Sequence, residues 1–94
     1  MITAIAKTQC TDFDQWLTGF AKHGTQRAKF GCTGCQVYRG LENANELTIV
    51  FNWSSAKDMQ AFMTDPSVQQ EIAKAGTIGA PVVSVTSHFC SFSS

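Results

Sequence analysis

Two side chains suited to proton transfer and anion binding stand four positions apart, at His23 and Arg27, in a segment with helical periodicity. Residues four apart share one helix face, and a helical wheel places both beside Trp16, at the edge of an apolar stripe. Imidazole exchanges a proton near neutral pH, and the planar guanidinium of Arg27 can hold an enolate, phenolate or carboxylate. The pair therefore predicts a catalytic site if this edge overlooks a cavity. The alternative is a surface histidine beside an arginine whose stem covers apolar area.

Three further side chains are candidates for ligand binding, at Trp16, Tyr38 and Asn52. Tyr38 and Asn52 fall in segments with strand alternation, where each can hydrogen-bond either a ligand or a neighbour inside the fold. Trp16, like Trp53, is equally suited to the core.

The four cysteines consist of one CxxC pair, Cys32 and Cys35, and two single residues, Cys10 and Cys90. No secretory leader is evident, which favours reduced thiols or metal ligands over disulfides. A zinc ribbon needs a second pair, and a thioredoxin-type motif opens a helix, whereas this pair follows a helix and leads into a strand. Spacing alone therefore favours buried free thiols.

The elements that must position these residues repeat one pattern, strand then helix then strand, around a central hairpin. We expect strands over residues 2–7, 35–39, 46–53 and 83–89, and helices over residues 12–29 and 55–75, the second one broken at 65–66. This βαββαβ order predicts an α+β fold with both helices on one face of a four-stranded antiparallel sheet. The opposite face, read as apolar too, would need a second subunit to cover it.

Local signals set the boundaries of these elements. Thr11 is placed to cap the first helix, with Asp14 as its capping-box partner, and Gly31 to end it. Gly76 and Gly79 predict a turn before the last strand.

Composition excludes several functions. The chain has 94 residues, which predicts a single domain over 1–94, and its seven Lys and Arg offset seven Asp and Glu. The basic residues are scattered from Lys7 to Lys74, which argues against nucleic acid as a partner. No apolar run is long enough to cross a bilayer, so we expect no membrane partner and a cytoplasmic protein.

As a set, several motifs resemble the dimeric α+β barrel proteins of the antibiotic biosynthesis monooxygenase and stress-responsive barrel type. The resemblance covers most of the chain and is carried by the helix start at 12–16, His23 with Arg27, Gly34, the strand end at 51–53 followed by serine, the break at 62–66 and the turn at 75–81. It implies a ferredoxin-like protomer, a homodimer whose sheets form a barrel, and a small-molecule cavity between sheet and helices. The family includes oxygenases that need no cofactor, haem-degrading enzymes and isomerase-like members, so fold alone does not settle function.

The resemblance bears on cofactors and metals as well. The haem-degrading branch would need an asparagine on the first strand, which this chain lacks, and we expect no cofactor. In such dimers the last strand approaches the partner's second strand, so His88 and Cys90 could meet Cys32 and Cys35 across the interface as a zinc ligand set. Buried free cysteines are the alternative.

Three functions remain open. The first is a homodimeric cofactor-independent monooxygenase or isomerase-like enzyme acting on a small aromatic or enolisable compound, with His23 and Arg27 as catalytic residues. The second is a binding module that uses the same cavity without turnover. The third is a structural protein whose interior is filled by side chains such as Phe20, Phe30 and Met59.

Overall fold

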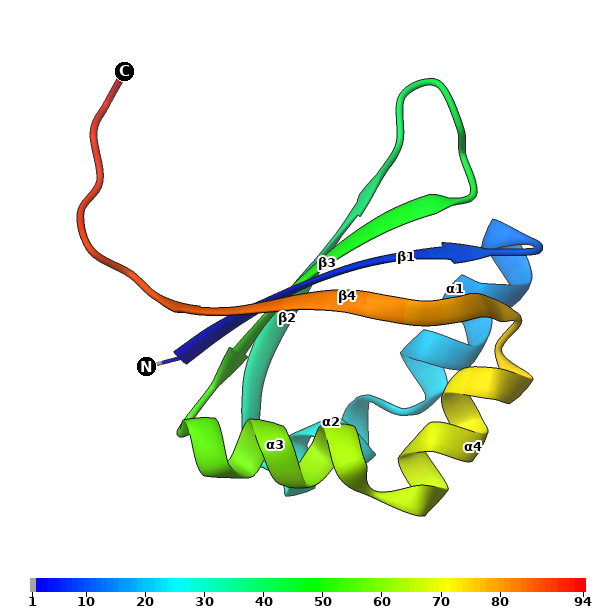
Figure 1. The fold of residues 1–94 in the computed structure, drawn as a ribbon, viewed down its shortest axis with the longest axis horizontal. Coiled ribbons are helices and arrows are strands. Elements are labelled where there is room, and N and C mark those ends of the chain that lie inside the picture. The colour runs from blue at the N-terminus through cyan, green and yellow to red at the C-terminus, as the bar shows by residue number, and fades with distance from the viewer. Residues whose placement is uncertain (1) are drawn as a thin grey trace.

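The computed structural model describes residues 2–94 as a four-stranded antiparallel sheet with four helices against it. The elements are β1 (Ile2–Cys10), α1 (Phe13–Lys22), α2 (Gly24–Lys29), β2 (Cys32–Arg39), β3 (Glu46–Trp53), α3 (Ala56–Thr64), α4 (Pro66–Lys74) and β4 (Thr77–Ser87). The strand order is β2-β3-β1-β4, and Figure 1 shows the helices gathered below the sheet. The predicted ferredoxin-like α+β fold is confirmed, with an open sheet. No helix within residues 2–94 combines the length and apolar character needed to cross a membrane.

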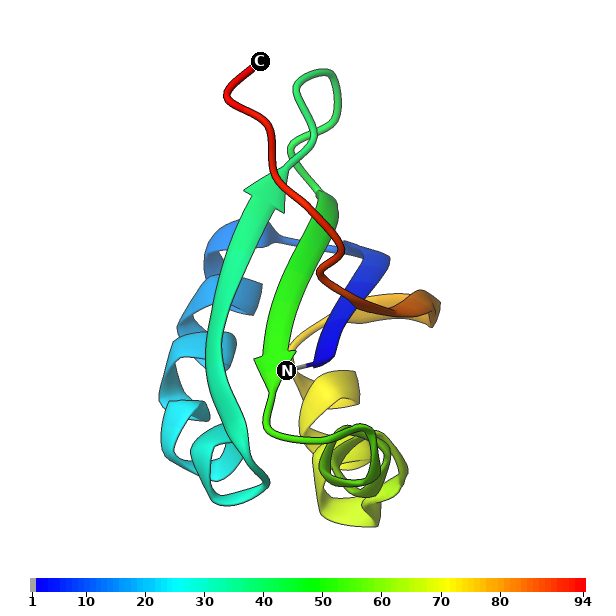
Figure 2. The ribbon, with the colours of Figure 1, turned by 90° about the vertical axis from the view of Figure 1, so that its left-hand side faces the viewer.

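The helix-facing side of the central strands forms the core. Alternate residues of β3 from Leu47 to Trp53 are buried, as their alternation predicts. The facing residues of β1 are small: Ala4 pairs with Phe51, and Ala6 pairs with Ile49. These alanines leave room under the helices for larger side chains. Figure 2 shows β2 and β3 as the long hairpin beside this layer.

The prediction of one continuous first helix is wrong. The helix divides at His23, whose backbone (φ −99°, ψ 17°) ends α1 and begins α2. Gly24 follows, and glycine is among the poorest helix formers, which favours a break here. The cap was also misplaced, because the Asp12 carboxylate accepts the Gln15 N–H at 3.1 Å while the Thr11 hydroxyl donates to the Gly76 carbonyl at 3.4 Å.

The predicted break in the second helix is confirmed. The Ser55 hydroxyl caps α3 by accepting the Asp58 N–H at 3.1 Å. Asp65 then caps α4 by accepting the N–H groups of Ser67 and Val68, and Pro66 occupies the first turn. Proline suits the first turn because its missing N–H is not needed there.

Both edge strands are longer than predicted at their starts. β2 begins at Cys32 rather than near residue 35, because Cys32 pairs with Trp53. β4 begins at Thr77, which pairs with Cys10, so Gly76 lies in a turn just before the strand, as predicted, whereas Gly79 lies inside the strand at a bulge. β4 ends at Ser87, and His88 therefore lies outside the strand, in the segment that leaves the sheet in Figure 1.

The face of the sheet opposite the helices is mixed rather than apolar. Directly paired residues share a face, so the register assigns its members. Apolar Ile5, Val50 and Val82 alternate there with polar side chains from all four strands, including Thr3, Lys7, Thr48, Asn52, Ser84 and Thr86. The reading of this face as a second apolar surface is therefore wrong, and a partner would meet hydrogen-bonding groups as well.

Candidate functional site

A cavity of about 90 Å³ lies between the helices and the sheet. Its lining is mostly apolar and comes from β1, β3, the start of β4 and all the helices, including Ala6, Trp16, Phe20, Ile49, Phe51, Phe62, Val68 and Ile72. His23 and Arg27 both line it. An engineered apolar cavity of ~150 Å³ takes up benzene, so this space fits at most a single ring, with some movement of its walls.

Arg27 is the buried charge of this site, with 9% of the residue exposed. Its guanidinium carbon lies 3.7 Å from the centroid of the Phe20 ring, and its Nη1 donates to the Phe20 carbonyl at 2.6 Å. No aspartate or glutamate within the described chain forms an ion pair with it. A buried cation is costly without a counter-charge, so Arg27 is equipped to take an anion from the cavity.

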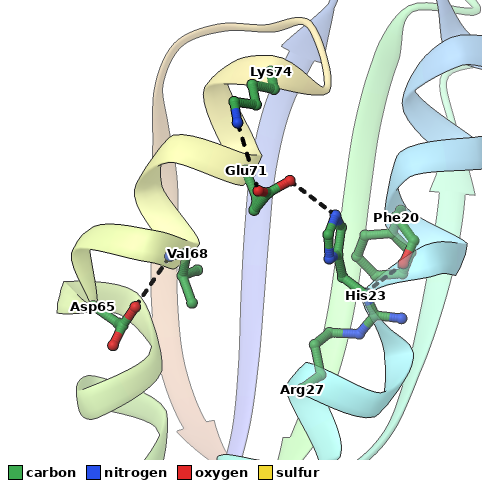
Figure 3. A network of polar contacts seen from close by, with 7 residues as sticks. All are labelled: Phe20, His23, Arg27, Asp65, Val68, Glu71 and Lys74. Carbon is green, nitrogen blue, oxygen red and sulfur yellow. Dashed lines mark hydrogen bonds and ion pairs between the residues drawn. The ribbon is translucent and has the colours of Figure 1, made fainter.

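His23 lies at the rim of the cavity, where α1 meets α2. Its Nε2 is 3.0 Å from Oε2 of Glu71 on α4, and each of the two side chains is 36% exposed. Figure 3 shows this pair spanning the gap between the two pairs of helices, with Lys74 on the far side of Glu71. A carboxylate on Nε2 favours the tautomer with its proton there and leaves Nδ1 as a proton acceptor.

The three predicted ligand-binding residues lie on different sides of the sheet. Trp16 is buried, lines the cavity and stacks on Phe20 with ring centroids 4.8 Å apart. Tyr38 and Asn52 lie on the opposite face of the sheet, away from this cavity. Asn52 accepts a hydrogen bond from the Thr3 hydroxyl at 2.9 Å, and the exposed Tyr38 hydroxyl donates to Gln36.

The CxxC pair faces the helices. Residues three apart on a regular strand point to opposite faces, but a register shift between Cys32 and Gly34 places both Cys32 and Cys35 against the core. Burial raises the pKa of the Cys32 thiol, whereas a redox-active thiol needs a lowered pKa. No group of three or more His, Cys, Asp or Glu able to hold a metal is found within residues 2–94.

The remaining members of the proposed interface zinc site lie in the C-terminal segment. His88 Nε2 is 2.7 Å from the Ser91 hydroxyl, and Cys90 is exposed. A site shared between two subunits stays a prediction for these residues.

Sequence reasoning missed four polar residues of the cavity lining, Thr8, Gln26, Glu71 and Thr77. Strand alternation puts Thr8 on the same side as Ala4 and Ala6, so a signal for it was present. Glu71 reaches His23 only because α4 packs beside α1, and nothing local in the sequence indicates that neighbour.

Comparison with solved structures identifies the fold. The oxygenase SnoaB from Streptomyces nogalater, which needs no cofactor, superposes with a TM-score of 0.79 at 10% identity, over 99% of this chain and 97% of its own. A candidate antibiotic biosynthesis monooxygenase from Bordetella bronchiseptica superposes with a TM-score of 0.80 at 19% identity, over 95% and 97% of the two chains. A similarly named protein from Chloroflexus aurantiacus J-10-fl gives 0.71 at 19% identity, over 97% and 95%.

The chain has the antibiotic biosynthesis monooxygenase fold. The resemblance expected from the sequence motifs is thereby confirmed at the level of the fold. No protein-family model matches the sequence. No curated protein matches it either.

Proposed function

We propose that this protein is a homodimer that binds a small aromatic or enolisable anion in its cavity and acts on it as a cofactor-independent monooxygenase. The observation that carries the proposal is Arg27, a buried guanidinium that lines an apolar cavity and has no carboxylate partner in the described chain. An anionic oxygen from a ligand would supply the missing counter-charge. The fold shared with SnoaB, a cofactor-independent oxygenase, supports oxygenation as one chemistry that this architecture can host.

In this proposal His23 removes a proton from the bound compound. Glu71 holds Nε2–H, Nδ1 takes the proton from a hydroxyl or an activated C–H, and Arg27 stabilises the enolate or phenolate that forms. Dioxygen then reacts with the electron-rich carbon, so that an activated CH₂ and O₂ give a carbonyl group and water. An isomerase-like reaction would use the same proton transfer without dioxygen.

The assembly part of the proposal rests on the open face of the sheet. Ile5, Val50 and Val82 place apolar surface there, and no helix of residues 2–94 covers it. A domain of this size also buries a smaller share of its surface than a larger one, so a second copy on this face would add stability.

Benzoate is a suitable first probe because it offers one ring and one carboxylate. We expect chemical shifts of cavity residues to move on titration, and Arg27→Met to weaken benzoate binding at least about tenfold, the loss of a charge-assisted hydrogen bond. Arg39→Met is the matched control, because Arg39 also stacks on a ring, Phe13, but lies exposed on the surface. Equal benzoate affinity in wild type and Arg27→Met would contradict the proposal.

A binding module without turnover is the second candidate, because Arg27 accounts for anion binding without any reaction. The enzyme and the binding module predict different behaviour for the His23→Ala variant. The enzyme predicts that this variant keeps benzoate binding but no longer consumes dioxygen with phenols or β-dicarbonyl compounds. A wild-type protein that binds such compounds and leaves dioxygen untouched would favour the binding module.

A further inference from the structure

One buried hydroxyl group has no hydrogen-bond partner within residues 2–94. Of the side-chain nitrogen and oxygen atoms in residues 2–94, two are buried without a partner, the Thr8 hydroxyl and the Trp53 indole nitrogen. Thr8 lines the cavity and Trp53 does not. Burying an unpaired hydroxyl costs free energy, and a valine of nearly the same shape would avoid that cost.

The local structure explains why Thr8 lacks a partner. On one side it pairs with Leu47 of β3, but on the β4 side the register jumps, with Lys7 opposite Val82 and Gln9 opposite Ile78. Residues 79–81 of β4 therefore bulge beside this one threonine. Gly79 adopts φ +69°, which suits glycine, and Pro81 has no N–H to offer. Bulges of this kind often lie next to sites where a side chain must face a ligand.

The position of Thr8 complements that of Arg27. Thr8 comes from the sheet floor of the cavity and Arg27 from the helices above it, and both residues line the same space. The Thr8 hydroxyl itself is closed off from that space, so a ligand oxygen reaches it when the Thr8 side chain turns about its Cα–Cβ bond toward the cavity. Between them the lining is largely aromatic and aliphatic. A ligand that satisfies both groups has an apolar body with an anionic oxygen on one part and a second oxygen on another.

We propose that Thr8 is a ligand-binding residue that hydrogen-bonds a second oxygen of a single-ring anion whose anionic oxygen lies on Arg27. This rests on the proposed function and narrows its ligand class to rings that carry two oxygen substituents, such as hydroxybenzoates. Thr8 selects among ring anions, whereas Arg27 accepts any of them.

Two probes separate the roles, benzoate and 4-hydroxybenzoate, titrated by NMR. We expect the wild type to bind 4-hydroxybenzoate about five- to tenfold more tightly, as one added hydrogen bond gives. Thr8→Val should remove this preference and leave benzoate affinity unchanged. Thr3→Val is the matched control on the same strand, because the Thr3 hydroxyl is already bonded to Asn52 and faces away from the cavity.

Thermal unfolding without any probe gives an independent readout. Because the Thr8 hydroxyl has no partner, Thr8→Val should melt at or above the wild-type temperature, while Thr3→Val should melt below it. A Thr8→Val protein that melts several degrees lower would show that the hydroxyl has a structural partner, which overturns this inference.

A failure of the proposed role of Thr8 can be distinguished from a failure of the proposed function. If Arg27→Met weakens both probes but the preference for 4-hydroxybenzoate survives in Thr8→Val, the role of Thr8 is wrong and the proposed function stands. If neither probe binds the wild type at millimolar concentration, the proposed function fails and the role of Thr8 fails with it.

Discussion

The two faces of the sheet differ in how their polar groups are satisfied. On the open face, the Thr3 hydroxyl donates to Asn52, and the Thr86 hydroxyl donates to the Thr3 carbonyl at 2.8 Å. On the helix-covered face, the Thr8 hydroxyl has no partner in the described chain and Arg27 has no counter-ion there. These two open-face threonines are hydrogen-bonded within the protein, whereas the Thr8 hydroxyl and the Arg27 charge on the covered face are not matched by a partner or a counter-ion in the described chain. This contrast, more than the presence of a histidine, directs attention to the covered face.

Removing the central residue of the covered face should have the largest effect on stability. Trp53 is 0% exposed, and Trp53→Ala should lower the free energy of unfolding by about 3–5 kcal/mol, measured by urea denaturation. Val82→Ala on the open face is the comparison and should cost about 1 kcal/mol or less. Similar losses for the two variants would contradict the assignment of the core to one face. Trp53→Phe should cost less than Trp53→Ala, because the indole nitrogen makes no hydrogen bond within the described chain.

A charge on the open face tests whether that face meets a second copy. Val50→Lys should shift the protein from twice the mass of one chain to a single chain in light scattering, because an unpaired lysine would be buried in the interface. Ala61→Lys, on the exposed side of α3, should leave the mass unchanged. A wild type that is already a single chain at micromolar concentration would refute the dimer.

The start of α1 offers a test of the corrected cap. Asp12→Ala should lower the free energy of unfolding by about 1 kcal/mol, the usual cost of losing an N-cap. Thr11→Ala should cost less, because its hydroxyl makes a longer bond to the Gly76 carbonyl at 3.4 Å and caps nothing. The reverse order in chemical denaturation would restore the cap predicted from the sequence.

The His23–Glu71 ion pair at the rim of the cavity should contribute little to stability. Glu71 and His23 are both partly exposed, so Glu71→Gln should change the free energy of unfolding by less than about 1 kcal/mol. If Glu71 orients His23, the same variant should lower dioxygen consumption well beyond that modest change in stability. An effect on folding alone, with turnover intact, would remove Glu71 from the mechanism.

The buried cysteines should have the smallest effect on stability, and this effect should depend on pH. Burial raises the pKa of both Cys10 and Cys32 above the ordinary 9.0. A thiol whose pKa is raised by folding stabilises the fold fully below pH 9.0, and this contribution is lost as pH rises through the raised pKa. Stability should therefore fall slightly above pH 9, and iodoacetamide should modify exposed Cys90 first and buried Cys10 last. Rapid modification of Cys10 at pH 7 would contradict this burial.

The sequence predicted those features that depend on periodicity within one element. Alternation placed Phe51 and Trp53 in the core, and helical spacing placed His23 and Arg27 beside Trp16 on what proved to be the cavity wall. The same alternation puts Asn52 on the face away from Phe51. Applied consistently, it would have excluded Asn52 from the cavity.

What the sequence did not predict depends on irregular geometry or on neighbours distant in the chain. The bulge beside Cys32 turns both cysteines to one face, and nothing in the pattern marks it. The contact between His23 and Glu71 depends on how α1 and α4 pack. Thr11 and Asp12 can each cap a helix, and only the tertiary bond to Gly76 decides between them.

The central position of β1 has a consequence for the order in which the molecule forms. Ile2 pairs with Trp53 on one side and with Ser87 on the other. The first strand to be synthesised therefore completes its pairing only when the last strand is available. Pairings between such distant segments slow folding, because a long stretch of chain must be closed before they stabilise anything. On the ribosome, β1 and α1 would emerge long before Phe51 and Trp53 and would remain without their packing partners. We therefore expect this small protein to fold slowly for its size and late in its own synthesis.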